Sequence, residues 1–159
     1  GCHVIYFAGY KTQKDRFYPE RIEEFSDKVV YSCEEQIFQP RRKSDYNVEG
    51  NIIDSISYAK ELGLLNNVDQ IICIGSSYMM QALADQKSSL FSNDVEMICG
   101  INSPMQCMMK GICGQCIQKV SDDRGYVFSC QYQDQNAEFI DFDVLHDRLS
   151  QNSLFEKSK

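Results

Sequence analysis

The sequence lacks most features that mark the common functional classes. It has two histidines, and no Walker loop, H-E-x-x-H motif or Ser–His–Asp order, so hydrolase and kinase functions have no support. Neither His3 nor His146 lies beside a candidate nucleophile or in a metal-ligand spacing, and neither is assigned to catalysis. No apolar run is long enough to span a membrane, and the first residues do not resemble a secretory signal peptide.

Positive charge is also scarce. The 159 residues include 16 Lys and Arg against 23 Asp and Glu, a net charge of −7. Nucleic acid and anionic membrane surfaces would repel such a chain, so neither is expected as a partner. With 43% hydrophobic and 25% charged residues, the composition is that of a globular protein with one domain and at most a small appendage. We expect a cytoplasmic protein.

Cysteine, by contrast, is plentiful, and four of the eight cysteines gather after residue 100. They are Cys107, Cys113, Cys116 and Cys130. Their C-x5-C-x2-C…C spacing is close to the plant-type C-x4-C-x2-C…C pattern of [2Fe–2S] proteins, with one extra residue in the first interval. Gly111 and Gly114 lie where the loop must turn tightly. Four soft thiolates suit an iron–sulfur cluster or zinc, and the spacing favours the cluster.

Two other interpretations of these cysteines stay open. A tetrahedral structural zinc site tolerates the same intervals. Eight cysteines could also form a disulfide framework, although the chain is longer than typical disulfide miniproteins. The extra residue before Cys113 makes Cys107 the least secure ligand. The remaining cysteines are expected to pack in the core, as free cysteines usually do. These are Cys2, Cys33, Cys73 and Cys99.

Apolar patterns divide the first hundred residues into alternating strands and helices. Strands are predicted over 3–8, 28–32, 69–74 and 95–99, and helices over 19–25, 51–62 and 78–90. In the first helix, Ile22 and Phe25 should face inward, and residues 33–49 should form an irregular loop. The alternation predicts an α/β fold: a parallel sheet with flanking helices, its strands buried on both faces.

The pattern changes near Gly100. A hairpin is predicted from 117–120 paired with 126–130, followed by a closing helix over 142–149. We therefore predict two domains, 1–100 and 101–159, the second a small cysteine-rich β-hairpin lobe with a C-terminal helix.

These features together resemble the C-terminal half of the dihydroorotate dehydrogenase electron-transfer subunit, within the ferredoxin–NADP reductase superfamily. Gly75-Ser-Ser-Tyr-Met79 resembles the family's G-P-x-x-M turn. Met105-Gln-Cys107 and Val127-Phe128-Ser-Cys130 resemble the segments that carry the first and fourth cluster ligands. The resemblance spans nearly the whole chain. It implies a nucleotide-binding-like α/β domain over 1–100, lacking its first strand, and a [2Fe–2S] lobe over 101–159.

The resemblance also implies NAD(P) and FAD as cofactors of the parent flavoprotein, the FAD in a barrel domain absent from this chain. The implied nucleotide contacts are Gly9, Tyr10, Glu34, Gly75, Ser76, Ser77 and Met79. Each also has a plain structural explanation. Ser76 or Ser77 would cap a helix, Met79 would pack in the core, and Glu34 would be a solvated loop carboxylate. A carboxylate at Glu34 would favour NAD over NADP if it met the ribose hydroxyls.

Three departures from the family pattern change what is expected. Ser76 replaces the proline of the turn, and Ile74 stands where related reductases often place a cysteine. The family's first strand and its glycine-rich phosphate turn are missing. We therefore expect a fragment of a larger flavoprotein subunit, with negligible NADH affinity of its own. Its open strand edges should be covered in a homo-oligomer or by a rearranged sheet.

Two functions follow as hypotheses. In the first, the chain is an electron-transfer module of an NAD(P)H-dependent flavoprotein oxidoreductase, inactive on its own, which relays electrons through a [2Fe–2S] cluster to a redox partner or catalytic subunit. In the alternative, the same thiolates hold zinc in a structural or protein-interaction module. Iron, sulfide and zinc content distinguishes the two.

Overall fold

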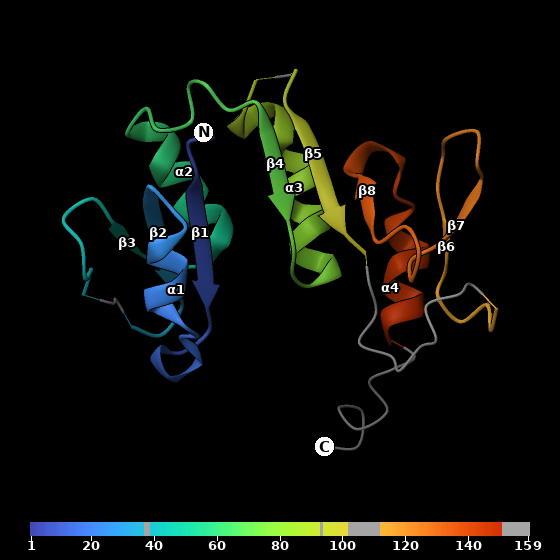
Figure 1. Cartoon of the computed structure of the whole chain (residues 1–159), viewed down its shortest axis with the longest axis horizontal. Coiled ribbons are helices and arrows are strands. Elements are labelled where there is room, and N and C mark those ends of the chain that lie inside the picture. Colours follow the sequence, from blue (N-terminus) through green and yellow to red (C-terminus); the bar gives the residue numbers. More distant parts are fainter. Residues whose placement is uncertain (37–38, 93, 102–111, 151–159) are drawn as a thin grey trace. The chain divides into compact units, whose positions relative to one another are not determined.

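The computed structural model describes residues 1–36, 39–92, 94–101 and 112–150. The chain forms two compact units, unit 1 (Gly1–Asn67) and unit 2 (Val68–Lys159), drawn from blue to teal and from green to red in Figure 1. Strands on either side of Gly100 share one sheet in unit 2, so the compact units do not divide near that residue. The predicted domains, 1–100 and 101–159, stay a prediction.

Unit 1 is a parallel three-stranded sheet in the order β1-β2-β3, with helices packed against it (Figure 1). Its elements are β1 (Ile5–Tyr10), the 3-10 turn Gln13–Asp15, α1 (Pro19–Glu24), β2 (Lys28–Cys33), β3 (Tyr46–Glu49) and α2 (Ile52–Glu61). Helix α2 packs on all three strands and α1 on β2. Asn51 caps α2 by accepting hydrogen bonds from two backbone N–H groups, which explains why the helix begins there.

The core of unit 1 centres on β2, whose Val29, Tyr31 and Cys33 are fully buried. Ile22 packs against this core as predicted, whereas Phe25 is 65% exposed and the prediction that it faces inward is wrong. Strand β3 was not predicted. It is a four-residue strand of mixed polarity that forms by pairing with β2 rather than from an apolar pattern of its own.

Unit 2 joins a three-stranded mixed sheet, a two-stranded hairpin and two helices (Figure 1). Its elements are β4 (Gln70–Cys73), α3 (Ser77–Leu90), β5 (Glu96–Gly100), β6 (Ile117–Lys119), β7 (Tyr126–Phe128), β8 (Asp134–Asn136), the 3-10 turn Ala137–Phe139 and α4 (Phe142–Ser150). Strands β4 and β5 are parallel, and the unpredicted β8 pairs antiparallel with β5. The predicted hairpin is confirmed, with Gln118 opposite Val127.

Helix α4 lies against both α3 and the hairpin strand β6. Its inner face carries Leu145 and Arg148, which are three residues apart and both buried. This packing buries the Arg148 guanidinium against the hairpin that carries Cys116 and Cys130.

The strands are not buried on both faces as the sequence predicts. Tyr6 in β1 is 44% exposed and Ile72 in β4 is 68% exposed. Among the described residues β1 pairs only with β2, and β4 only with β5, so each strand has one edge without a strand partner. Within the described part of the chain, no helix combines the length and apolar character needed to cross a bilayer.

Candidate functional site

Two of the predicted metal ligands lie in direct contact. Cys116 ends a tight turn just before β6, and Cys130 follows β7, so the hairpin brings them together. Their Sγ atoms are 3.2 Å apart, and both residues are buried. The turn depends on Gly114, which has a φ of +73°, and the carbonyl of Gly114 accepts the Ile117 N–H. The tight turn predicted at Gly114, with a backbone conformation that favours glycine, is therefore confirmed.

The other two predicted ligands are not part of this contact. Cys113 is exposed at the start of the turn, and Cys107 and Gly111 lie outside the described residues. Over residues 1–36, 39–92, 94–101 and 112–150, no three His, Cys, Asp or Glu side chains gather closely enough to hold a metal. Ligation by all four cysteines stays a prediction.

The contact between Cys116 and Cys130 fits two corners of a thiolate-bound metal. Metal–sulfur bonds of about 2.3 Å in a tetrahedron place neighbouring sulfurs about 3.8 Å apart. The observed 3.2 Å requires the two sulfurs to separate by roughly half an ångström, which a side-chain adjustment can supply. The donor chemistry, two soft thiols in a buried setting, suits iron or zinc.

A buried arginine lies beside this cysteine pair. Arg148 on α4 is 7% exposed and donates three hydrogen bonds. Its Nη2 donates to the Ile101 carbonyl at 2.7 Å, Nη1 to Ser129 Oγ at 3.1 Å and Nε to Gln118 Oε1 at 3.3 Å. All three acceptors are neutral. Burial lowers the pKa of Arg148, and the neighbouring Cys116 thiolate opposes that shift.

The surroundings of Cys116 favour its thiolate form. Burial raises the pKa of the Cys116 thiol, but hydrogen bonds from Cys130 and the positive charge of Arg148 outweigh it. The net pKa is therefore below the ordinary value. The thiolate is the form of cysteine that binds metal ions.

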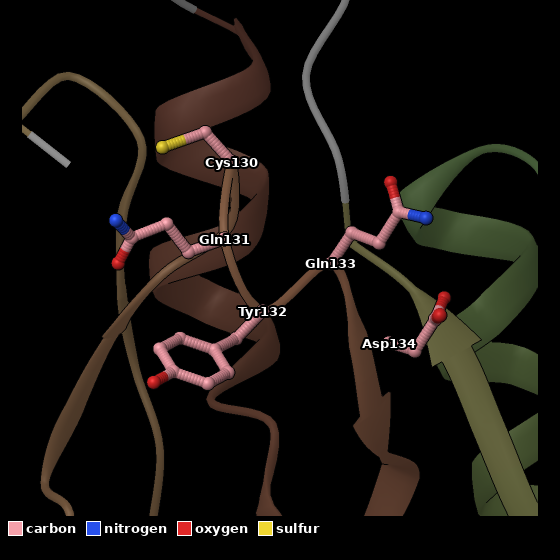
Figure 2. Close-up of a pocket in the computed structure, with 5 residues that line it drawn as sticks. All are labelled: Cys130, Gln131, Tyr132, Gln133 and Asp134. Carbon is pink, nitrogen blue, oxygen red and sulfur yellow. The ribbon is translucent and has the colours of Figure 1, made fainter. Parts of the chain in front are cut away.

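A hollow of about 390 Å³ opens beside this pair, along the turn that follows β7. Its five lining residues run consecutively from Cys130 to Asp134. Figure 2 shows the Cys130 and Tyr132 side chains on one side of the turn and the Gln133 side chain on the other. Tyr132 is 55% exposed, so the chain next to Cys130 is open to the surface.

The remaining described cysteines are separate from this site. Cys33, Cys73 and Cys99 are buried, which confirms their predicted place in the core, whereas Cys2 is exposed and that prediction is wrong. Cys2 precedes β1 and therefore has no sheet to pack against. Cys73 and Cys99 occupy paired positions in β4 and β5. A hydrogen bond from Cys99 lowers the pKa of the Cys73 thiol, and that bond together with burial raises the pKa of Cys99.

The predicted nucleotide turn follows β4, at the carboxyl end of a parallel strand. Ser76 is the N-cap of α3, and its Oγ accepts a hydrogen bond from the Met79 N–H at 3.1 Å. A Cβ at Gly75 would come within 2.4 Å of the Met79 methyl group, so the Met79 side chain folds back over this glycine. The structural explanation of Ser76 is thus confirmed, and nucleotide contact by Gly75 and Met79 stays a prediction.

Ser77, the next residue, is buried and bonded to His146 of α4. The Ser77 Oγ and His146 Nδ1 atoms are 2.7 Å apart, and His146 Nε2 lies 2.7 Å from Gln81 Oε1. The His146 ring stacks on Tyr78 with centroids 4.1 Å apart. These contacts join α3 to α4. The Ser77 hydroxyl is hydrogen-bonded to another side chain of the same unit.

The three predicted nucleotide contacts of unit 1 lie where β1 and β2 end. Side chains of unit 1 lie close to Gly9: a Cβ there would come within 3.2 Å of Ile52 and 3.3 Å of Ser32. Burial raises the pKa of the partly buried Tyr10, and its carbonyl accepts the N–H of the exposed Glu34. A nucleotide site that draws on both units stays a prediction.

Comparison with known proteins supports the fold. The chain resembles the solved structure of an NADH-dependent reduced ferredoxin-NADP oxidoreductase, studied for flavin-based electron bifurcation, with a TM-score of 0.56 and 20% identity. The match covers 98% of this chain and 61% of that one. The chain therefore has a ferredoxin reductase-like α/β fold, as the sequence predicts. No protein-family model matches it.

A closer sequence relative is an uncharacterized protein of Rickettsia prowazekii (strain Madrid E). The two are 50% identical over 93 residues, which are 58% of this chain and 13% of the relative. The chain thus spans a small part of that protein.

Sequence reasoning missed Arg148 and Gln118 as parts of the site. The signal for Arg148 was present, because its spacing from Leu145 places it on the apolar face of an amphipathic helix. No comparable signal marked Gln118. Its burial follows from the alternation of the short strand β6, in which only the middle residue faces inward.

Proposed function

We propose that this chain is an electron-transfer module of an NAD(P)H-dependent flavoprotein oxidoreductase, with a [2Fe–2S] cluster bound by Cys107, Cys113, Cys116 and Cys130. The contact between the Cys116 and Cys130 thiols carries the proposal. The ferredoxin reductase-like fold supports it, since that fold is the one found in the NADH-dependent oxidoreductase compared above.

The chain's own residues would hold the centre and set its surroundings. A [2Fe–2S] cluster accepts and releases one electron at a time. Cys116 and Cys130 are buried, which would keep water from their side of the centre, while exposed Cys113 would place the opposite side near the surface. The open turn beside Cys130 offers a short path to a redox partner. In the parent protein, NAD(P)H would supply the electrons by reducing FAD.

The test is the metal content of the full chain purified without oxygen. We expect iron and acid-labile sulfide in equal amounts, with visible absorption that is partly bleached on reduction. Cys116→Ser should lose both, whereas Cys73→Ser, a buried cysteine of the same unit, and Cys2→Ser, an exposed one, should keep them. Stoichiometric zinc without sulfide would replace electron transfer with the zinc-stabilised module. A Cys116→Ser protein with full iron content would show that the ligands are wrong.

A further inference from the structure

Arg148 connects the three segments that carry the predicted ligands. Its Nη2 holds the carbonyl of Ile101, the residue before the segment that contains Cys107. Its Nη1 holds the hydroxyl of Ser129, which immediately precedes Cys130. Its Nε holds the amide of Gln118, two residues after Cys116. One guanidinium thus binds residues on either side of the cysteine pair, Gln118 after Cys116 and Ser129 before Cys130.

The charge of Arg148 is not balanced by a carboxylate. Every ion pair found among the described residues involves other basic side chains. Segment 102–111 contains no Asp or Glu at all, and 151–159 contains only Glu156. Removing a cation from water without an opposite charge is costly, and hydrogen bonds to neutral acceptors recover only part of that cost. A buried arginine in this setting calls for a nearby anion.

The thiolate centre would be that anion. Four cysteine thiolates around a zinc ion, or around an oxidised [2Fe–2S] cluster, carry roughly two negative charges in total. Reduction of the cluster adds one more. A fixed positive charge nearby stabilises the reduced form more than the oxidised one, because it interacts with the larger negative charge.

We propose, building on the metal-binding function above, that Arg148 is the fixed counter-charge of the thiolate centre and that it raises both the metal affinity and the reduction potential of that centre. Arg148 is not a ligand. It is a positioning residue whose charge acts on the centre and whose hydrogen bonds hold Gln118 and Ser129, beside Cys116 and Cys130.

The test compares Arg148→Gln, which removes the charge, with Arg148→Lys, which keeps the charge but loses the planar fork. Arg124→Gln is the control, because Arg124 belongs to the same hairpin but is exposed and paired with Asp122. Two quantities are measured on the full chain: the midpoint potential in an anaerobic redox titration, and the Zn²⁺ affinity of metal-free protein by competition with a coloured chelator.

For Arg148→Gln we expect the equilibrium for reduction to fall roughly tenfold, a shift of about 59 mV to lower potential, and Zn²⁺ affinity to fall by a similar factor. Arg148→Lys should keep most of both quantities, and Arg124→Gln all of them. Equal losses in the Gln and Lys variants would assign Arg148 a purely structural role and overturn the proposal. The Zn²⁺ affinities of the variants can be compared even if Arg148→Gln does not retain a cluster.

The outcomes separate this inference from the proposed function. If the natural protein holds zinc, electron transfer fails while the zinc affinities still test the counter-charge. If the wild-type chain binds neither iron nor zinc, both proposals are overturned. If it holds a cluster whose potential and affinity do not respond to Arg148→Gln, only the counter-charge is overturned.

Discussion

Units 1 and 2 each bury a charged side chain, Asp45 and Arg148, but only Asp45 has an oppositely charged partner among the described residues. In unit 1 the Asp45 carboxylate is fully buried and accepts hydrogen bonds from the Val29 N–H and from Arg42. In unit 2 the partners of Arg148 are a carbonyl, a hydroxyl and an amide, all of them neutral. The buried charge of unit 1 is therefore paired within that unit, whereas the buried Arg148 of unit 2 contacts only neutral acceptors, beside a pair of thiols that we propose as metal ligands.

Removal of the metal should affect units 1 and 2 very differently. When a chelator strips the protein under anaerobic conditions, we expect hydrogen exchange in residues 112–130 and in α4 to rise roughly a hundredfold, because metal binding contributes directly to folding free energy. Unit 1 should keep its protection. Mass-spectrometric hydrogen exchange measures both units at once, and an equal response in both would remove the distinction drawn here.

A second test removes the buried carboxylate of unit 1. Asp45→Ala leaves the Val29 N–H and the Arg42 guanidinium without their acceptor, so we expect unit 1 to lose about 2–3 kcal/mol of stability. Metal content should not change. Glu61→Ala, which alters an exposed carboxylate at the end of α2, is the matched control and should be near neutral. Urea unfolding monitored by hydrogen exchange measures the stability of each unit. A loss of stability in unit 2 would contradict the expectation that the effect is confined to unit 1.

A smaller effect tests the turn after β4. Ser76→Ala removes the N-cap of α3 and should cost about 1 kcal/mol, while Ser76→Asn should restore most of it. Ser88→Ala on the same helix is exposed and serves as the control. Local exchange rates at the start of α3 measure the change. A neutral Ser76→Ala would mean that the hydroxyl does not act as a cap.

The smallest expected effect depends on pH. A hydrogen bond from Lys119 and another from the Val144 N–H lower the pKa of Asp141, which precedes α4. A lowered carboxyl pKa contributes stability that is present above about pH 3.9 and is lost as pH falls through the lower folded value. Asp141→Asn should lower Tm by about 1 °C or less at pH 7, with the difference closing near pH 3. A difference that grows on acidification would contradict this assignment.

The elements with strong apolar patterns were predictable from the sequence. The strand around Val29 and the helix capped by Asn51 formed where their residues indicate, because a local pattern and a cap agree. Strands β3 and β8 were not predictable, since residues such as Asn47 and Gln135 enter strands only by pairing with a neighbour. Exposure of Phe25 also escaped prediction, because the short helix α1 ends one residue before it.

The candidate site was predictable in part. Spacing alone indicated Cys116 and Cys130, and the hairpin that joins them followed from the turn at Gly125. The buried partners of the site were not predictable, because Gln118, Ser129 and Arg148 are far apart in sequence and meet only when α4 packs on the hairpin. Such a polar cluster leaves no short motif.

The central claim is that Cys116 and Cys130 bind one cluster together with the remaining thiolates. X-ray absorption at the iron and zinc edges of the anaerobically purified full chain tests it most directly, since it reports the atoms around the metal. If the four thiolates bind one [2Fe–2S] cluster, each iron is surrounded by sulfur alone, with a second iron as the next neighbour. Iron bound to nitrogen or oxygen, or zinc as the metal bound to the sulfurs, would contradict it.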